Sequence, residues 1–205
     1  MQSIYINDYE LDQLKESVNI GASHASDALS HLINKTVMLS VPEVNYGDII
    51  TAPMFIGDAA TTITSIKVHL EKPTKGVMFY LFPDENDKKI LTIINPNRKQ
   101  GKDLSDEDLS TLSEIANILS GSFLTAISKF LGMDFMHSVS EIKIKNLGEV
   151  VNNTISEIVQ NSETKILILK INLEIRENDI KTNLFFIMDP NFTKDILDLS
   201  QKILS

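Results

Sequence analysis

Cysteine, long apolar runs and blocks of like charge are all absent from this chain of 205 residues. Without Cys, disulfides, zinc-thiolate sites and Cys nucleophiles are excluded. The N-terminus has neither a basic start nor a long apolar stretch, and internal apolar runs such as residues 166–169 are too short to span a bilayer. We therefore expect a cytoplasmic protein that does not insert into a membrane.

The chain is acidic, with 19 Lys and Arg against 28 Asp and Glu and a net charge of −9. Nucleic acid is not an expected partner, because binding to its phosphate backbone needs a cationic surface. The four His are scattered without an i, i+4 pair, and the chain has neither a Gly-rich phosphate loop nor a Ser nucleophile elbow. We expect neither a metal site nor a cofactor site in this chain.

A pattern of three polar residues, [DS]-x-x-x-E-x-x-N, occurs twice in the chain, 98 positions apart. Spacings of four and three residues put all three side chains on one face of a helix. The first copy is Asp12, Glu16 and Asn19, and the second is Ser110, Glu114 and Asn117. Two related helices are therefore expected to present the same set of polar groups.

Both copies lie in segments with helical periodicity. Residues 9–33 carry an apolar stripe at three- and four-residue steps, and Asp8 is the expected N-cap. Ser105 opens the second helix with Ser-x-x-Asp, in which Asp108 replaces the usual Glu or Gln of a capping box. The middle of the first helix, around Gly21, holds poor helix formers, so close packing or a functional surface must maintain it.

Strand-like segments follow each helix in a similar order. In the first part we expect a strand at 36–44, an irregular or single-turn segment at 47–56, a hairpin of strands 61–71 and 76–82, and a helix at 84–94. In the second part we expect a strand at 134–144, a helix at 147–160, strands at 165–175 and 181–188, and a helix from 191.

Residues 95–102 are the most linker-like stretch, because they combine Pro, Asn, Gly and basic residues. We therefore predict one domain, residues 1–205, made of two homologous halves, residues 1–97 and 98–205. The expected fold class is α/β (α+β), an internally duplicated pseudo-twofold unit. Its two long helices would pack on a shared, largely antiparallel sheet.

A Glu and an Asn on one helix face supply an anion and an amide, but no nucleophile and no group that titrates near neutral pH. Covalent catalysis is therefore not expected. The pair suits phosphoryl transfer, which depends on positioning, because an amide can hold a water in line with phosphorus. One such pair alone would more simply be a solvated Glu and a packing Asn, but its repetition favours a function.

The residues around each pair resemble the repeated signature of the CheC and CheX chemotaxis phosphatases, a family that includes FliY. The family pattern is [DS]-x3-E-x2-N-x22-P, and residues 11–22 together with Pro42 fit it throughout. Residues 113–123 continue the second copy, which departs from the pattern at its end, where Ser140 stands in the place of the family Pro. The resemblance covers nearly the whole chain.

This resemblance implies hydrolysis of the aspartyl phosphate on a chemotaxis response regulator, CheY. By resemblance, Asn19 and Asn117 would each orient the attacking water, and Glu16 and Glu114 would each pair with a Lys of the regulator. The regulator would supply both the aspartyl phosphate and Mg²⁺. Some CheC proteins also bind the receptor deamidase CheD, which makes CheD a second candidate partner.

Two other functions remain open. The protein could be a non-catalytic adaptor that binds phosphorylated CheY or CheD, and this role needs the same docking face. The intact Glu and Asn of both copies favour catalysis, because an adaptor has no need for an amide that holds water. A component of the flagellar switch is the third possibility, and we expect it least because the sequence shows no additional switch-binding domain or long N-terminal extension.

Overall fold

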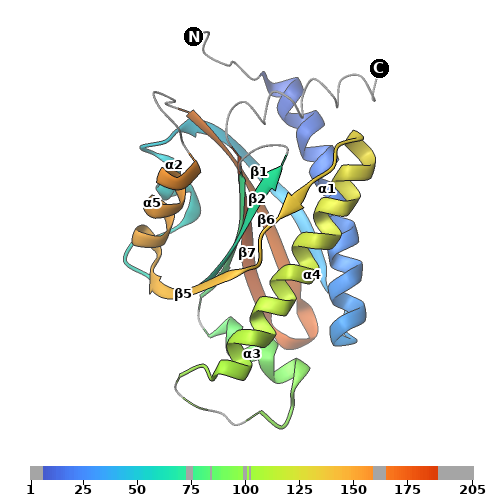
Figure 1. The fold of residues 1–205 in the computed structure, drawn as a ribbon, viewed down its shortest axis with the longest axis vertical. Coiled ribbons are helices and arrows are strands. Elements are labelled where there is room, and N and C mark those ends of the chain that lie inside the picture. The colour runs from blue at the N-terminus through green and yellow to red at the C-terminus, as the bar shows by residue number, and fades with distance from the viewer. Residues whose placement is uncertain are drawn as a thin grey trace.

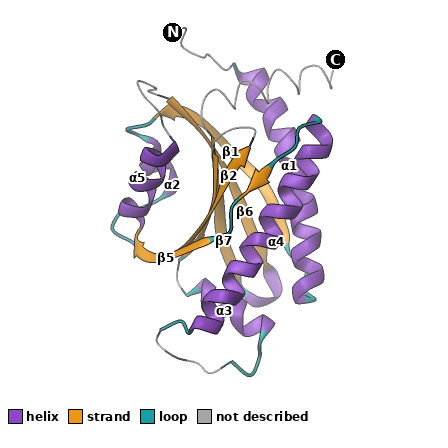
Figure 2. Cartoon of the chain, in the orientation of Figure 1, coloured by secondary structure: helices purple, strands orange, loops and turns teal. Residues whose placement is uncertain are grey.

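Two long helices cover one face of a β-sheet and two shorter helices cover the other (Figures 1 and 2). The computed structural model describes residues 7–72, 76–83, 85–98, 101, 103–158 and 165–188. The long helices, α1 (Asp8–Ile33) and α4 (Asp106–Leu131), have 26 residues each and lie side by side in antiparallel directions. The short helices α2 (Ala52–Ile56) and α5 (Leu147–Ile158) lie on the opposite face, and α3 (Asn86–Ile94) lies at one end.

Within the described residues the sheet has seven strands, and all of their pairings are antiparallel. Its order is β1-β6-β7-β3-β2-β4, with β5 also paired to β2. The strands are β1 (Met38–Asp48), β2 (Thr62–Lys72), β3 (Gly76–Phe82), β4 (Met136–His137), β5 (Glu141–Asn146), β6 (Lys165–Ile175) and β7 (Ile180–Met188), with a 3₁₀ turn η1 (Arg176–Asn178) between the last two. The predicted fold class, long helices on a largely antiparallel sheet, is confirmed.

The outer strands of the sheet are exchanged between the two parts of the chain. β1 pairs with β6 from the C-terminal part, and β4 and β5 pair with β2 from the N-terminal part. Two of these pairings carry a cross-strand ion pair, Glu43 with Lys170 at 3.5 Å between β1 and β6, and Glu141 with Lys67 at 3.7 Å between β5 and β2. Neither part of the chain therefore completes its side of the sheet alone. The division at residues 97 and 98 stays a prediction.

Local hydrogen bonds repeat with the same 98-residue spacing as the sequence pattern. Each long helix begins with a complete capping box and ends at a residue in the left-handed conformation. In each, a serine near the C-terminus accepts a backbone N–H from the segment that follows. The corresponding pairs are Asn7 and Ser105 at the N-caps, Asn34 and Gly132 at the C-caps, and Ser30 and Ser128 near the C-termini.

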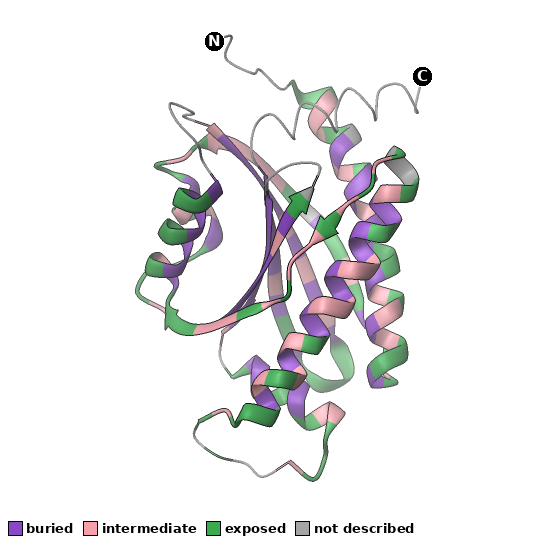
Figure 3. Cartoon of the chain, viewed as in Figure 1, coloured by how far each residue is buried: buried purple, intermediate pink, exposed green. Residues whose placement is uncertain are grey.

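The sheet has a hydrophobic core on each face, because its central strand β3 is buried on both sides. Met78 and Tyr80 point toward α1 and α4, whereas Val77 and Phe79 point toward α2 and α5. The Tyr80 hydroxyl lies 2.6 Å from the Ser120 hydroxyl, so its polar end is satisfied inside the first core. Figure 3 shows the resulting helices, buried toward the sheet and exposed on their outer faces.

Gly21 lies where α1 meets α4. A Cβ at this position would be 2.9 Å from Phe123 Cδ2 and 3.0 Å from Ile127 Cγ1, which is closer than side chains normally approach. The missing side chain therefore lets the two helices pack closely. Of the two explanations that the sequence left open for this poor helix former, the structure supports close packing.

Several predicted boundaries are wrong. The N-cap of α1 is Asn7 and not Asp8, because the Asn7 side chain accepts the Glu10 N–H while the Glu10 carboxylate accepts the Asn7 N–H. The predicted strand at 134–144 is two strands, β4 and β5, separated by residues 138–140. The predicted turn at 73–75, the end of the helix at 159–160 and the helix from 191 lie outside the described residues.

The linker-like stretch is anchored at Arg98. The guanidinium of Arg98 donates to both carboxylate oxygens of Asp108, at 2.5 and 2.8 Å, and the two side chains are only 5% and 8% exposed. Asp108 also accepts the Ser105 N–H of the capping box. The hydrogen bonds from Arg98 lower the pKa of Asp108 to about 2. This ion pair ties the segment before α4 to the first turn of the helix.

We expect Gly21→Ala to lower the free energy of unfolding by about 1–2 kcal/mol. The clash with Phe123 and Ile127 destabilises the fold by about 1–3 kcal/mol. The higher helix propensity of Ala offsets at most about 1 kcal/mol of this loss. Gly121→Ala is the matched control, because a Cβ there meets nothing closer than His137 Nε2 at 3.7 Å. Urea unfolding of both variants measures the difference. An equal effect of the two changes would contradict the close helix contact.

We expect Arg98→Ala to lower the free energy of unfolding by about 3 kcal/mol near neutral pH, because Asp108 keeps a buried charge without its partner. The folded pKa of Asp108 lies below its unfolded value, so this contribution is present above about pH 4. It disappears as the pH falls toward about 2.

Denaturant unfolding of the wild type and of Arg98→Ala between pH 7 and pH 2 measures this difference. Lys35→Ala, which breaks the exposed pair with Glu177, is the control and should change stability little at any pH. A difference between the wild type and Arg98→Ala that does not shrink at low pH would contradict the assignment to the ion pair.

Candidate functional site

The two polar triplets lie on faces of α1 and α4 that are not buried in the core. In both copies the Glu and the residue four positions before it are exposed, and the Asn is half-buried. The exposed residues are Asp12, Glu16, Ser110 and Glu114, and the half-buried residues are Asn19 and Asn117. The structure therefore brings each triplet together on one helix face, as its spacing predicts.

Core residues set the rotation of both helices. Leu14 and Val18 of α1, and Leu112 and Ala116 of α4, are buried against the sheet at four-residue spacing. Because these side chains face inward, Glu16 and Glu114, two positions after Leu14 and Leu112, face outward. The carboxylates of Glu16 and Glu114 form no ion pair among the described residues and remain available to a partner.

Asn19 is held by the backbone of β1. Its Oδ1 accepts a hydrogen bond from the Val41 N–H at 3.3 Å. The pairing of β1 with β6 shifts register between Ser40 and Glu43, so Val41 and Pro42 lie in an irregularity of the strand. At this irregularity the Val41 N–H lies outside the regular pairing of β1 with β6. It donates to the Asn19 side chain and orients the amide.

Asn117 lacks the corresponding contact. Its Oδ1 is buried and has no hydrogen-bond partner among the residues that the structure describes. Val139, at the position that corresponds to Val41, is 81% exposed, whereas Val41 is 3% exposed. Ser140 replaces the Pro of the first copy, and its hydroxyl donates to the Ser113 carbonyl at 3.3 Å. The two copies thus share a helix face but differ in the backbone beside it.

Known proteins are similar to this chain in both copies of the motif. The sequence model of the CheC-like family matches residues 10–46 and 107–139, which contain the two Glu and Asn pairs. The chain is 28% identical over 188 residues to the CheY-P phosphatase CheC of Bacillus subtilis strain 168, an alignment that covers 90% of each chain. In both copies of the motif the chain therefore resembles the CheC-like family.

Solved structures support the fold of this CheC-like chain. The crystal structure of Thermotoga maritima FliY matches with a TM-score of 0.80 at 18% identity and covers 97% of this chain and 99% of that one. The middle domain of FliM from H. pylori matches with a TM-score of 0.64 at 12% identity, over 95% of this chain and 99% of that one. At these identities the likeness concerns the fold alone.

A groove of about 460 Å³ runs beside Asn117 of the CheC-like chain. It is lined by His24 from α1 and by Ser122, Thr125 and Lys129 from α4. None of these residues was predicted to have a role, because His24 lies far from Asn117 in the sequence and only the packing of the two helices brings them to one groove. Val41 was also missed, because a backbone N–H leaves no signal in a residue pattern.

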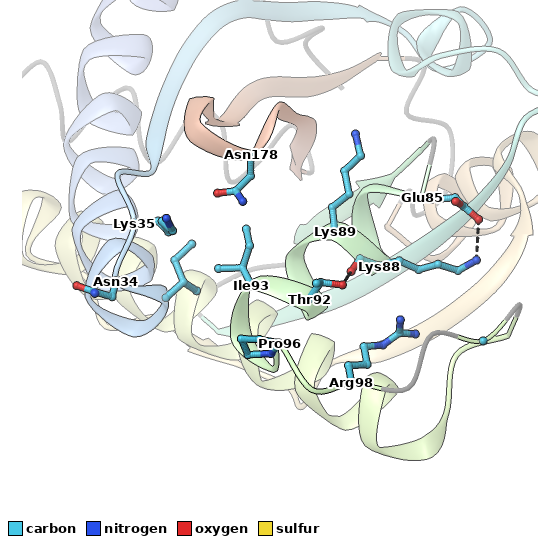
Figure 4. Close-up of a pocket in the computed structure, with 12 residues that line it drawn as sticks. Asn34, Lys35, Glu85, Lys88, Lys89, Thr92, Ile93, Pro96, Arg98 and Asn178 are labelled. Carbon is cyan, nitrogen blue, oxygen red and sulfur yellow. Dashed lines mark hydrogen bonds and ion pairs between the residues drawn. The ribbon is translucent and has the colours of Figure 1, made fainter.

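A larger cavity, of about 890 Å³, lies away from both triplets near the end of α1 and α3 (Figure 4). Its cationic side chains already have partners. Lys35 pairs with Glu177 at 2.9 Å, Lys88 pairs with Glu85 at 2.7 Å, and Arg98 is held by Asp108. Neither asparagine of the repeated motif lines this cavity, and we do not assign it to the candidate site.

Two absences hold within the described part of the CheC-like chain. No group of three or more His, Cys, Asp or Glu is placed to hold a metal ion. No helix is long and apolar enough to cross a membrane.

We expect Asn19→Ala to lower the free energy of unfolding by about 1 kcal/mol, because the Val41 N–H loses its acceptor in a partly buried position. Asn117→Ala removes a buried oxygen that has no partner, so it should leave stability unchanged or raise it slightly. Urea unfolding of the two single variants side by side measures this difference. A larger loss for Asn117→Ala would contradict the hydrogen bonding described for the two sites.

Proposed function

We propose that this CheC-like chain hydrolyses the aspartyl phosphate of a phosphorylated CheY-type response regulator. The observation that carries the proposal is the pair of outward helix faces, each with an exposed Glu and a half-buried Asn at matching positions. The B. subtilis relative, which is named CheY-P phosphatase CheC, supports the same activity.

The chemistry is an in-line attack of water on the phosphorus atom of the aspartyl phosphate. The new bond joins the water oxygen to phosphorus, and the bond from phosphorus to the Asp carboxylate oxygen breaks. The products are inorganic phosphate and the free carboxylate of the regulator. In this proposal Asn19 or Asn117 enters the active site of the regulator and orients the water through its amide, which can both donate and accept.

The regulator supplies what this surface does not. It brings the phosphorylated Asp and the Mg²⁺ that neutralises charge on the phosphoryl oxygens, as in other phosphoryl transfers. The exposed carboxylate of Glu16 or Glu114 pairs with a Lys of the regulator and sets its orientation on the helix. An acidic surface repels free phosphate but accepts a partner that carries its own cations.

The other motif residues support the asparagines. Asp12 and Ser110 lie one helical turn before the Glu, on the same exposed face, where they extend the docking surface. Pro42 lies with Val41 in the irregular part of β1 and has no N–H of its own for pairing with β6, while the Val41 N–H donates to Asn19.

We expect substoichiometric wild-type protein to accelerate the decay of phosphorylated CheY in the presence of Mg²⁺, with many turnovers per molecule. The double variant Asn19→Ala and Asn117→Ala should return the decay to the rate of the regulator alone, because no amide remains to orient water. Quantification of the phosphorylated regulator over time measures both rates.

Asn152→Ala is the matched control for this experiment. Asn152 is an exposed asparagine on α5, on the opposite side of the sheet, and its replacement should leave the acceleration unchanged. If the wild-type protein binds phosphorylated CheY without accelerating its decay, the adaptor function replaces the phosphatase. Binding of CheD, tested by co-purification, would extend that alternative.

A further inference from the structure

The two asparagines of the repeated motif differ in how their amides are held. The Asn19 Oδ1 accepts the Val41 N–H at 3.3 Å, whereas the Asn117 Oδ1 is buried with no partner among the described residues. A terminal amide turns easily about its last torsion, because that torsion has only broad and shallow preferences. A hydrogen bond from the backbone therefore decides whether the amide has one orientation or several.

The bond from Val41 prepares Asn19 for catalysis. It occupies one lone pair of Oδ1 and leaves the second lone pair and both protons of Nδ2 for a water and a phosphoryl oxygen. An amide whose orientation is set before the partner arrives loses no further freedom when it positions the attacking water.

Asn117 lies in a different environment. Its buried oxygen cannot accept a proton from a water at the surface unless the side chain first rotates. The segment that would supply an N–H is held elsewhere, because the Ser138 N–H donates to the His69 carbonyl at 2.9 Å and the Ser138 hydroxyl accepts the His69 N–H at 3.1 Å. Val139 is consequently turned toward solvent.

We propose that the two sites are unequal, with Asn19 carrying most of the hydrolysis because the backbone N–H of Val41 orients its amide. This inference rests on the proposed function and makes Val41 a positioning residue. The residues that decide the difference are Val41 and Pro42 in one copy and Val139 and Ser140 in the other. The duplicated motif then consists of one preorganised site and one site that must rearrange before it can act.

The direct test removes the N–H of Val41. In Val41→Pro the donor is lost, while pairing with β6 is spared because the register skips this position. We expect kcat for phosphorylated CheY to fall at least tenfold while KM changes less than twofold. Val41→Ala loses the same buried side chain but keeps the N–H, and its kcat should stay within threefold of wild type.

Val139→Pro is the matched change in the other copy. Val139 is exposed, and no described hydrogen bond uses its N–H, so its replacement should leave kcat at the wild-type value. Equal losses in Val41→Pro and Val41→Ala, or in Val41→Pro and Val139→Pro, would overturn the role of the Val41 N–H.

The single Asn variants give a second test that does not depend on the folding of Val41→Pro. Asn19→Ala should lower kcat at least tenfold and Asn117→Ala less than twofold. Equal losses, or a larger loss for Asn117→Ala, would refute the inference while leaving the phosphatase activity itself established. If the wild type accelerates no decay at all, the proposed function fails first.

A measurement without the regulator tests the structural premise alone. Relaxation of the side-chain ¹⁵N amides by NMR should show Asn19 rigid on the nanosecond scale and Asn117 more mobile. In Val41→Pro the Asn19 amide should become as mobile as that of Asn117, and in Val41→Ala it should stay rigid. Two amides of equal mobility in the wild type would remove the physical basis of the inference.

Discussion

The close contact of α1 and α4 at Gly21 is the constraint on which the candidate site depends. With no side chain at this position, Phe123 and Ile127 approach the backbone of α1, and both helices can lie flat on one face of the sheet. Once their apolar faces are buried, the opposite faces must be exposed, and these carry Glu16 and Glu114. The requirement for a packed core therefore also orients the two faces that carry the Glu and Asn pairs.

The exchange of outer strands adds a second constraint. β1 is held in place by β6, and β5 is held by β2, so the segments beside the two long helices are positioned by the other part of the chain. These two segments differ in sequence, with Pro42 in one and Ser140 in the other, and they also differ in their hydrogen bonds to the helices. A repeated motif can in this way have two different environments although its Glu and Asn are the same in both copies.

Much of the architecture could be predicted from periodicity. The two long helices, the capping box at Ser105 and the β2–β3 hairpin follow from local patterns, because each depends on residues close together in the sequence. The buried ion pair of Arg98 was not predictable in the same way, since a basic residue among Pro, Asn and Gly is more often exposed. The break at residues 138–140 was missed because strand propensity does not reveal where pairing stops.

The sequence by itself determined which residues form the candidate site, because helical spacing alone puts Glu16 with Asn19 and Glu114 with Asn117 on one face. It also showed that the motif occurs twice, at a constant offset of 98 residues. Only the tertiary structure decided that the Asn19 amide is held while the Asn117 oxygen is buried without a partner. The physical reason is that a hydrogen bond between a helix and a strand depends on the register of a distant pairing, and no local pattern encodes that register.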